Sequence, residues 1–444
     1  MTVAVIARGR VHADEVFQAL EPAHRLAFGA GEVAWEWVEG LRNWLVPGLL
    51  AFPLRAVAAL GARDPRWLVL PLWALCAAWQ ALGTLWLFRF VEERDGRRAA
   101  WLAGLVHATW GGFAIYAART LGDVLAIPAI LGALCFTGRA LRERQAPDGL
   151  WAGAALGLAI VLRYPSLVFA LPLGGAFAVA AVRADGGASR AWQAALGFAL
   201  GLALLLGALG VLDLASWGEP FHSLRRYLAF NRPGGGAERG FGTHPWWWYG
   251  EVFAGMAPLP LLYPFVQSLR RLGLAHACFF VYLGALLAHP HKEPRFLLPL
   301  LPLLAIAAAP DALRDLERWR ARAPRLVRLL APVYAAWSLA AASVLLPFAL
   351  DRDIVDGEVA AGRDPALRGL LVANDFWATG GRFWLHRDVP VRYGHVDAAL
   401  ADPAFTHLLF TDGVSLPEER LAAAGWTRWW REGSCEVWKR AENE

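Results

Sequence analysis

Long apolar stretches recur along the chain, and they constrain its fold more than any other feature. A transmembrane helix needs about 20 consecutive, mostly apolar residues. Stretches that approach or reach this length cover 67–88, 99–118, 123–140, 191–215, 251–268, 272–290, 296–309 and 327–350. The stretch 150–182 is long enough for two short crossings that turn at Arg163-Tyr164-Pro165, because the residue before a proline disfavours helix. The sequence therefore predicts an all-α polytopic membrane protein with about 10–11 transmembrane helices.

The composition excludes most other classes of protein. Of the 444 residues, 57% are hydrophobic and 18% are charged, whereas soluble globular chains carry about 25% charge. An ordinary soluble enzyme, a disordered regulator and a fibrous protein are excluded on this ground. The net charge of +5 does not indicate a nucleic-acid partner, because the arginines lie between apolar stretches, where membrane topology explains them. The four cysteines form no CxxC pair, so we expect neither a zinc site nor a disulfide framework.

The loop charges predict the orientation in the membrane. Basic clusters occupy alternate loops, which we place in the cytoplasm: Arg94/Arg97/Arg98, Arg139/Arg142/Arg144, Arg183/Arg190, Arg270/Arg271 and Arg314 through Arg328. The segments predicted to face outward are 10–44, 119–123, 216–250, 290–295 and the tail after 350. This alternation of cytoplasmic and outward loops holds only if 45–62 does not cross the membrane. We therefore expect 45–62, which prolines and Arg55 interrupt, to be re-entrant or interfacial. Residues 1–13 are too few to cross a bilayer, so we expect a first helix to be missing from this chain.

Two segments differ from the apolar stretches. Residues 14–28 form an amphipathic pattern that predicts a helix flat on the outer surface, with Phe17, Leu20, Ala27 and Phe28 on one side and Asp14, Gln18, Glu21 and Arg25 on the other. In the tail, 370–373 and 406–411 are typical of strands, 375–386 of a helix, and the Trp-rich 428–440 of extended chain. We therefore expect a membrane domain over 1–350, with 10–44 as its first external loop, and a small non-cytoplasmic α/β domain over 351–444.

Charged clusters lie in the segments predicted to face outward. The adjacent carboxylates Asp14 and Glu15 could provide a general base, although their spacing alone favours a solvated acidic helix start. The turn His291-Lys292-Glu293-Pro294-Arg295-Phe296 could bind a lipid-linked phosphate through its cations. The alternative for this turn is a basic interfacial loop. We favour a functional site, because external positive charge runs against the positive-inside tendency.

Two other outward segments have weaker signals. The loop 216–250 ends in His244-Pro-Trp246-Trp-Trp-Tyr249, which could form a platform for an isoprenoid chain or a sugar, or simply an interfacial aromatic belt. The turn from Arg119 to Asp123 is typical of a structural ion pair at a helix end, and Arg163 has the same interpretation.

Several motifs resemble those of one family. The hexapeptide His291–Phe296 resembles the HKExRF motif of the Alg9-like mannosyltransferases, glycosyltransferase family 22 of the C superfamily. Segments similar to the first external loop of that family are Asp14–Glu21, Ala23-His24, Phe28-Gly29, Trp35–Trp37 and Leu41–Trp44. The segments Gly242–Tyr249 and Arg119–Leu121 also fit, and the resemblance is collinear over about residues 12–310.

The resemblance implies a GT-C-like membrane enzyme that transfers mannose from a polyprenyl-phosphate carrier to an acceptor hydroxyl with inversion. It implies that Asp14 is the base, with Glu15 beside it, and it places these residues at the donor phosphate or the acceptor: His291, Lys292, Glu293, Arg295, His244, Trp246, Tyr249 and Arg119. The chain departs from the family pattern at Ala13, where proline is usual, and at Trp247, where histidine is usual. Asp123 and Ala126 replace an Asn and a Glu, so a second acidic role is not expected there.

The expected partners are a lipid-linked sugar donor, a glycan or glycolipid acceptor and membrane lipids. The sequence indicates no required cofactor, and it leaves open whether a divalent metal takes part. We expect an integral protein of a bacterial inner membrane with its active site facing outward, and the endoplasmic reticulum is the alternative. The sequence leaves three alternatives to a mannosyltransferase open: a transferase of another polyprenyl-phosphate sugar, a transporter or flippase for lipid-linked sugars, and a non-catalytic sugar-binding scaffold.

Overall fold

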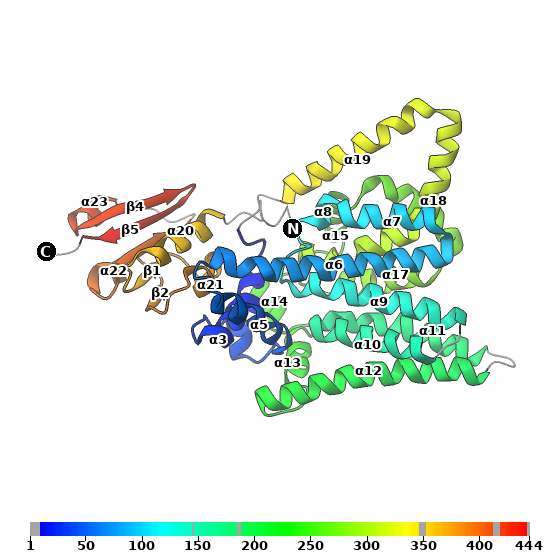
Figure 1. Ribbon diagram of the computed structural model, residues 1–444, viewed down its shortest axis with the longest axis horizontal. Helices are drawn as coiled ribbons and strands as arrows, with labels where there is room; N and C mark the ends of the chain where they lie inside the picture. The colour runs from blue at the N-terminus through cyan, green and yellow to red at the C-terminus, as the bar shows by residue number, and fades with distance from the viewer. Residues whose placement is uncertain (1–8, 144–145, 184–187, 346–351, 412–417, 442–444) are drawn as a thin grey trace. The chain divides into compact units, whose positions relative to one another are not determined.

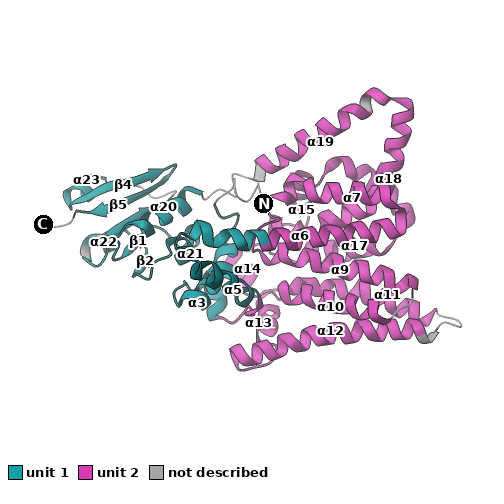
Figure 2. Cartoon of the chain, in the orientation of Figure 1, with its two compact units in different colours: residues 1–38, 46–74, 346–444 teal, residues 39–45, 75–345 magenta. Residues whose placement is uncertain are grey.

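The computed structural model describes residues 9–143, 146–183, 188–345, 352–411 and 418–441. The chain forms two compact units (Figure 2). Unit 1 contains residues 1–38, 46–74 and 346–444, and unit 2 contains residues 39–45 and 75–345. The predicted division at residue 350 stays a prediction.

Unit 2 is helical throughout its described residues (Figure 1). Its α-helices are α6 (Pro65–Asp95, which begins in unit 1), α7 (Arg97–Thr109), α8 (Gly111–Ala114), α9 (Gly122–Glu143), α10 (Ala146–Leu162), α11 (Ala170–Val182), α12 (Ala188–Trp217), α13 (His222–Phe230), α14 (Gly236–Phe241), α15 (Trp248–Met256), α16 (Leu262–Ser268), α17 (Leu274–Ala288), α18 (Leu300–Arg322) and α19 (Pro324–Leu345). Short 3-10 helices cover Tyr164–Phe169, Leu259–Leu261, Leu269–Arg271 and Pro294–Leu297.

The apolar helices confirm a polytopic membrane fold. Among the described residues, five helical segments are long and apolar enough to cross a bilayer: Pro65–Asp95, Gly122–Glu143, Tyr164–Val182, Arg190–Trp217 and Pro294–Arg322. Four shorter apolar helices accompany them: Leu45–Ala59, Ala146–Leu162, Leu274–Ala288 and Val327–Ser343. The first of these, α5 (Leu45–Ala59), is shorter than the roughly 20 residues that a crossing needs, and its predicted interfacial position stays a prediction.

The predicted turn within 150–182 is confirmed. Helix α10 ends at Leu162, Arg163 is extended (φ −153°, ψ 107°), and the chain resumes as a 3-10 helix that leads into α11. Pro165 explains the break, because it disfavours helix at the residue before it and supplies no backbone N–H. Arg163 therefore lies outside regular helix, between α10 and the 3-10 helix.

Helix α10 approaches α12 closely through glycines spaced four residues apart. A Cβ atom added at Gly149 or Gly153 would lie about 2 Å from a backbone carbonyl of α12, at Ala194 or Phe198. Glycines at this spacing let two helix backbones pack together in a membrane, where packing and not the hydrophobic effect holds helices together. Either substitution by a larger residue would push the two helices apart.

Two stretches that were predicted as single crossing helices are not single straight helices. The stretch 99–118 is not one helix, because α7 stops at Thr109 and the extended Trp110 donates its indole N–H to the Met256 carbonyl at 2.6 Å. The stretch 251–268 is bent by 104° between α15 and the helical segment that begins at Leu259. Pro258 explains this bend, because Ala257 before it adopts an extended conformation.

Unit 1 combines N-terminal helices with a C-terminal α/β fold. Its elements are α2 (Ala13–Glu15), a π-helical turn (Val16–Leu20), α3 (Glu21–Phe28), α4 (Trp35–Val38), α5, the start of α6, α20 (Arg352–Arg363), β1 (Leu370–Val372), a 3-10 helix (Phe376–Ala378), α21 (Gly381–Leu385), β2 (Val391–Tyr393), α22 (Asp397–Ala401), β3 (His407–Phe410), α23 (Glu418–Ala423), β4 (Trp426–Glu432) and β5 (Cys435–Arg440).

The strands form one five-stranded sheet in the order β2-β1-β3-β5-β4. Strand β1 is parallel to β2 and β3, whereas β5 is antiparallel to β3 and β4. Side chains alternate between two cores, with Leu370 against Ile354 of α20 and Leu371 against Leu421 of α23. The predicted strands at 370–373 and 406–411 are confirmed, and the extended chain predicted at 428–440 is divided between β4 and β5. The segment 375–386 forms two short helices and not one.

The N-terminal segment 14–28 is helical as predicted, but Glu21 on its predicted polar face is fully buried. The Glu21 carboxylate accepts hydrogen bonds from the backbone N–H groups of Phe383 and Glu32. Phe17, on the apolar face, packs edge-on against Phe376 and Trp377. The prediction that the polar face is solvated is therefore wrong at Glu21, because this residue fixes the segment to α21.

We expect Glu21→Gln to lower the free energy of unfolding by about 1–3 kcal/mol, because the new amide N–H2 would face a backbone N–H and leave a buried donor unpaired. Burial raises the pKa of Glu21 to about 8, although the hydrogen bonds from the backbone N–H groups of Phe383 and Glu32 act in the opposite direction. The folded state then holds a proton that the unfolded state releases, so this carboxyl reduces stability as the pH rises from about 4.5 to about 8.

Denaturant titration of the purified protein at pH 5 and pH 8 checks both points. The glutamine variant should lose the part of the pH dependence that Glu21 contributes. Glu432→Gln, at an exposed position on β4, is the control and should leave stability within about 0.5 kcal/mol. Equal stability and an unchanged pH dependence in Glu21→Gln would show that the buried carboxyl does not fix this segment.

Candidate active site

Four charged side chains of unit 2 form a buried cluster, which we name the charged quartet: Asp123, Arg163, Glu293 and Arg295. Arg163 Nε lies 2.8 Å from Asp123 Oδ1, and Arg295 Nε lies 3.7 Å from Asp123 Oδ2. Arg295 also binds Glu293 through two atoms, with Nε 2.7 Å from Oε2 and Nη2 2.9 Å from Oε1. Asp123, Arg163 and Arg295 are buried, and Glu293 is partly exposed.

Breaks between apolar helices position the quartet. Asp123 lies in the first turn of α9, where a carboxylate complements the helix dipole. Arg163 lies in the break before Pro165, and Glu293 is extended before Pro294 starts the 3-10 helix that contains Arg295. Three helix ends far apart in sequence therefore bring their charges together.

The quartet balances two guanidinium groups against two carboxylates. Burying four charges is costly unless each has partners, and removing one partner of a buried pair costs about 3–5 kcal/mol. The Phe296 ring lies next to both arginines, with the Arg163 and Arg295 guanidinium carbons 5.2 and 5.5 Å from its centroid. The ring face adds a cation–π attraction that helps to hold both cations at this depth.

A cavity of about 650 Å³ adjoins the quartet. Its walls are mainly apolar and include Leu167, Val168, Leu171, Leu228, Leu286 and Phe296. Asp123 and Arg163 line it as well, together with Asn231, Arg232 and His289. A site with apolar walls and a charged edge suits an amphiphilic ligand, with its chain against the walls and its anionic group at the arginines.

The other members of the predicted hexapeptide lie at the same turn. His291 Nε2 is 3.1 Å from Glu293 Oε1, and His291 Nδ1 is 3.3 Å from the Gly242 carbonyl. Lys292 is buried, and its Nζ donates hydrogen bonds to the carbonyls of Leu287 and His289 at the end of α17. Burial lowers the pKa of Lys292. These bonds would have to break before Lys292 could bind a phosphate.

The structure brings the predicted aromatic loop against this turn. The buried Tyr249 accepts a hydrogen bond from the Glu293 N–H at 3.3 Å, and Lys292 Nζ lies 5.6 Å from the centre of its ring. His244 donates its backbone N–H to the Pro290 carbonyl at 3.1 Å, and its ring stacks on Trp248. Trp246 is 69% exposed, and Arg119 is fully buried. The aromatic loop that ends at Tyr249 and the hexapeptide turn therefore contact each other, although Tyr249 and Glu293 are 44 residues apart in sequence.

The predicted carboxylates of the first loop lie in unit 1. Asp14 lies in α2 with its side chain 12% exposed, and its Oδ1 is 3.5 Å from His12 Nδ1. The buried Glu15 accepts the Val11 N–H at 3.1 Å through Oε1, which holds the start of the helix. Because Asp14 and the quartet belong to different units, the prediction that they flank one cavity stays a prediction.

Sequence reasoning missed the part that Asp123 and Arg163 play. Both were interpreted as structural ion pairs, whereas Asp123 joins Arg163 to Arg295 of the hexapeptide turn. One signal could have found them. The loop charges that place 119–123 and 290–295 outside also require the turn between the two short crossings of 150–182 to lie on that face. Within the described residues, no group of three or more His, Cys, Asp or Glu side chains is placed to hold a metal ion.

The fold is similar to that of a crystal structure of ArnT from Cupriavidus metallidurans bound to undecaprenyl phosphate. The TM-score is 0.66 over 99% of this chain and 96% of that chain, with 14% sequence identity. The apo form of the same protein gives a TM-score of 0.62. This likeness confirms the predicted GT-C-like fold.

Curated relatives agree in sequence. The chain is 27% identical over 391 residues to GPI mannosyltransferase 3 of Yarrowia lipolytica, covering 85% of this chain and 71% of the relative. It is 30% identical over 355 residues to GPI mannosyltransferase 3 of Drosophila melanogaster, covering 73% and 57%. It is 28% identical over 317 residues to GPI alpha-1,2-mannosyltransferase 3 of Danio rerio, covering 69% and 56%. The chain thus spans little more than half the length of the last two relatives.

These relatives come from a yeast, an insect and a fish, and they lend no support to the predicted bacterial inner membrane. The apolar helices and the fold identify an integral membrane protein. The model of the Alg9-like mannosyltransferase family matches residues 1–348, which include the first external loop, the charged quartet and the hexapeptide turn. The chain belongs to the Alg9-like mannosyltransferase family of membrane glycosyltransferases.

Proposed function

We propose that this protein transfers mannose from polyprenyl-phosphate mannose to a hydroxyl of a glycolipid acceptor, with inversion at the anomeric carbon. The observation that supports it is the charged quartet at the edge of an apolar cavity, in a chain of a mannosyltransferase family. The cavity would take the first isoprene units of the donor, and the arginines would take its phosphate. The undecaprenyl phosphate in the similar ArnT structure supports this class of ligand.

The leaving group dictates what the protein must supply. A lipid phosphate departs as an anion, so it requires cations and not a strong acid. Arg163 and Arg295 are the groups proposed to face it, since a guanidinium binds phosphate oxygens through paired hydrogen bonds. Asp123 and Glu293 hold these arginines in place before the donor arrives, and Lys292 holds the turn through the end of α17.

The acceptor hydroxyl requires a base. Its pKa is far above neutrality, so a carboxylate must take its proton as the new C–O bond forms and the bond from the anomeric carbon to the phosphate oxygen breaks. We assign this role to Asp14 in the first external loop. A β-linked donor would give an α-linked product.

The acceptor is proposed from the printed names of the relatives. Those names specify glycosylphosphatidylinositol and, for the fish protein, an α-1,2 linkage. We therefore propose a mannose-containing glycolipid of this kind as the acceptor, at the non-cytoplasmic face of the membrane. We propose the endoplasmic reticulum membrane as its location, which is the alternative that the sequence left open.

A donor comparison tests the proposal. Membranes that contain the protein should transfer labelled mannose from polyprenyl-phosphate mannose into glycolipid, and they should not transfer it from GDP-mannose when synthesis of the lipid carrier is blocked. Membranes that lack the protein are the control. Transfer from GDP-mannose under this block would contradict the proposed donor. Translocation of the labelled lipid without a new glycosidic bond would instead support the flippase alternative.

A further inference from the structure

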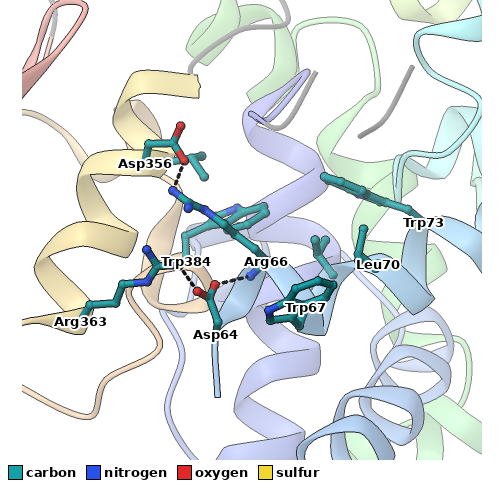
Figure 3. Close-up of a pocket in the computed structure, with 10 residues that line it drawn as sticks. Asp64, Arg66, Trp67, Leu70, Trp73, Asp356, Arg363 and Trp384 are labelled. Atoms are coloured by element: carbon teal, nitrogen blue, oxygen red, sulfur yellow. Dashed lines mark hydrogen bonds and ion pairs between the residues drawn. The ribbon is translucent and has the colours of Figure 1, made fainter. Parts of the chain in front are cut away.

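A second cavity, of about 320 Å³, lies wholly within unit 1 (Figure 3). Its walls come from Asp64, from the first turns of α6, and from α20 and α21 of the α/β fold. The side chains that matter here are Asp64, Arg66, Trp67, Asp356, Arg363 and Trp384. The mechanism proposed above uses none of them.

The charged groups of this cavity are paired and balanced. Arg66 forms an ion pair with Asp356, and Arg363 forms one with Asp64 (Figure 3). Asp64 also accepts the Arg66 backbone N–H at 2.9 Å. Burial opposes ionisation of Asp64, but the hydrogen bonds from Arg363 and the Arg66 N–H outweigh it and lower its pKa. The lining therefore offers donors and acceptors that these ion pairs hold in place, and its two arginines and two aspartates balance in charge.

Two buried donors of the lining have no acceptor. Among the described residues, neither the indole Nε1 of Trp384 nor the Nε of Arg66 has a hydrogen-bond partner. Trp384 is 2% exposed, so its unpaired N–H is withheld from bulk water. A buried unpaired donor costs about 1–3 kcal/mol, and a ligand oxygen or an ordered water beside it would recover part of that cost.

An exposed indole lies at the same cavity. Trp67, in the first turn of α6, is 63% exposed. A flat apolar ring beside paired carboxylates and guanidiniums matches the two faces of a sugar. The C–H face of a pyranose packs on an aromatic ring, and its hydroxyls bond to both carboxylates and guanidiniums.

We propose that this cavity binds a neutral sugar unit of the acceptor glycan, with its apolar face on Trp67 and its hydroxyls at the Arg66–Asp356 and Arg363–Asp64 pairs. The assignment of the sugar to the acceptor rests on the proposed function. Sugar binding itself rests only on this cavity.

Binding of α-linked mannotriose to the full-length protein in lipid nanodiscs tests the site, with saturation-transfer NMR as the readout and inorganic phosphate as a competing probe. Trp67→Ala should weaken mannotriose binding about tenfold, or about 1.4 kcal/mol, and Trp67→Phe should retain most of it. Trp429→Ala, at a 43% exposed indole on β4 away from the cavity, is the matched control and should bind as the wild type does. In the transfer assay, Trp67→Ala should raise the acceptor KM by a similar factor and leave kcat and the donor KM unchanged.

The outcomes separate this site from the proposed function. Wild-type binding of mannotriose by Trp67→Ala, absence of mannotriose binding by the wild type, or its displacement by millimolar phosphate would each overturn the sugar site. Trp67-dependent mannotriose binding by a wild type that transfers no mannose would support the sugar site and reject the proposed transferase. Binding that depends on Trp67, together with a raised acceptor KM, supports both.

Discussion

Replacing Asp14 with asparagine is expected to lower kcat for mannosyl transfer by about 10³-fold, within the 10²–10⁴-fold range of general-base catalysis. Asparagine has nearly the same shape as aspartate, but its amide cannot take the proton of the acceptor hydroxyl. The donor KM should change little, because the phosphate is proposed to bind at Arg163 and Arg295. Transfer of labelled mannose from polyprenyl-phosphate mannose in membranes gives both constants.

A carboxylate from the same predicted loop provides the matched control. Glu39 is exposed and pairs with Arg226 at 2.7 Å, a surface contact worth less than about 1 kcal/mol. Glu39→Gln should therefore keep nearly full activity, whereas Asp14→Asn should lose it at equal protein abundance. More than a tenth of wild-type kcat in Asp14→Asn would remove Asp14 from the role of base and direct attention to another carboxylate.

The sequence predicted the fold correctly in segments whose conformation depends on a single local feature. Apolar length identified the long helices, and a single proline predicted the break at Arg163. The same rules failed where distant partners decide the conformation. Gly111-Gly112 is a local signal for the end of α7, but nothing nearby in the sequence shows that the Trp110 indole binds the carbonyl of Met256, more than a hundred residues away. Likewise, the buried Glu21 looks like a solvated helix residue until Phe383 supplies its partner.

The candidate site was predicted in part for a similar reason. The hexapeptide from His291 to Phe296 was found because its charges are consecutive in a turn between apolar stretches. Asp123 and Arg163 are single charges in separate turns, and each resembles an ordinary helix end. Only the packing of α9, α10 and α17 makes them neighbours of Arg295. A buried cluster assembled from isolated charges leaves no local pattern, so the sequence showed one half of the quartet and not the other.

Replacing Arg295 with lysine is expected to lower kcat/KM for polyprenyl-phosphate mannose about 100-fold, equivalent to about 2.7 kcal/mol. The guanidinium contacts Glu293 through two atoms and also approaches Asp123, which a single ammonium group cannot reproduce. Lysine would also lose the paired hydrogen bonds proposed for the donor phosphate. The donor KM should therefore rise, whereas the acceptor KM should not.

A second substitution separates phosphate binding from simple charge balance. If Arg295 only neutralises Glu293, then Arg295→Gln should lose stability and transfer, and adding Glu293→Gln should restore both, because the neutral pair leaves no buried charge without a partner. If Arg295 binds the donor, the double variant should recover stability while its donor KM stays high. Arg270→Lys, at an exposed arginine that lies 3.6 Å from Asp311, is the matched control and should change neither. An Arg295→Lys enzyme with wild-type donor KM would show that the donor phosphate is bound elsewhere, and the apolar cavity beside the quartet would then need another ligand.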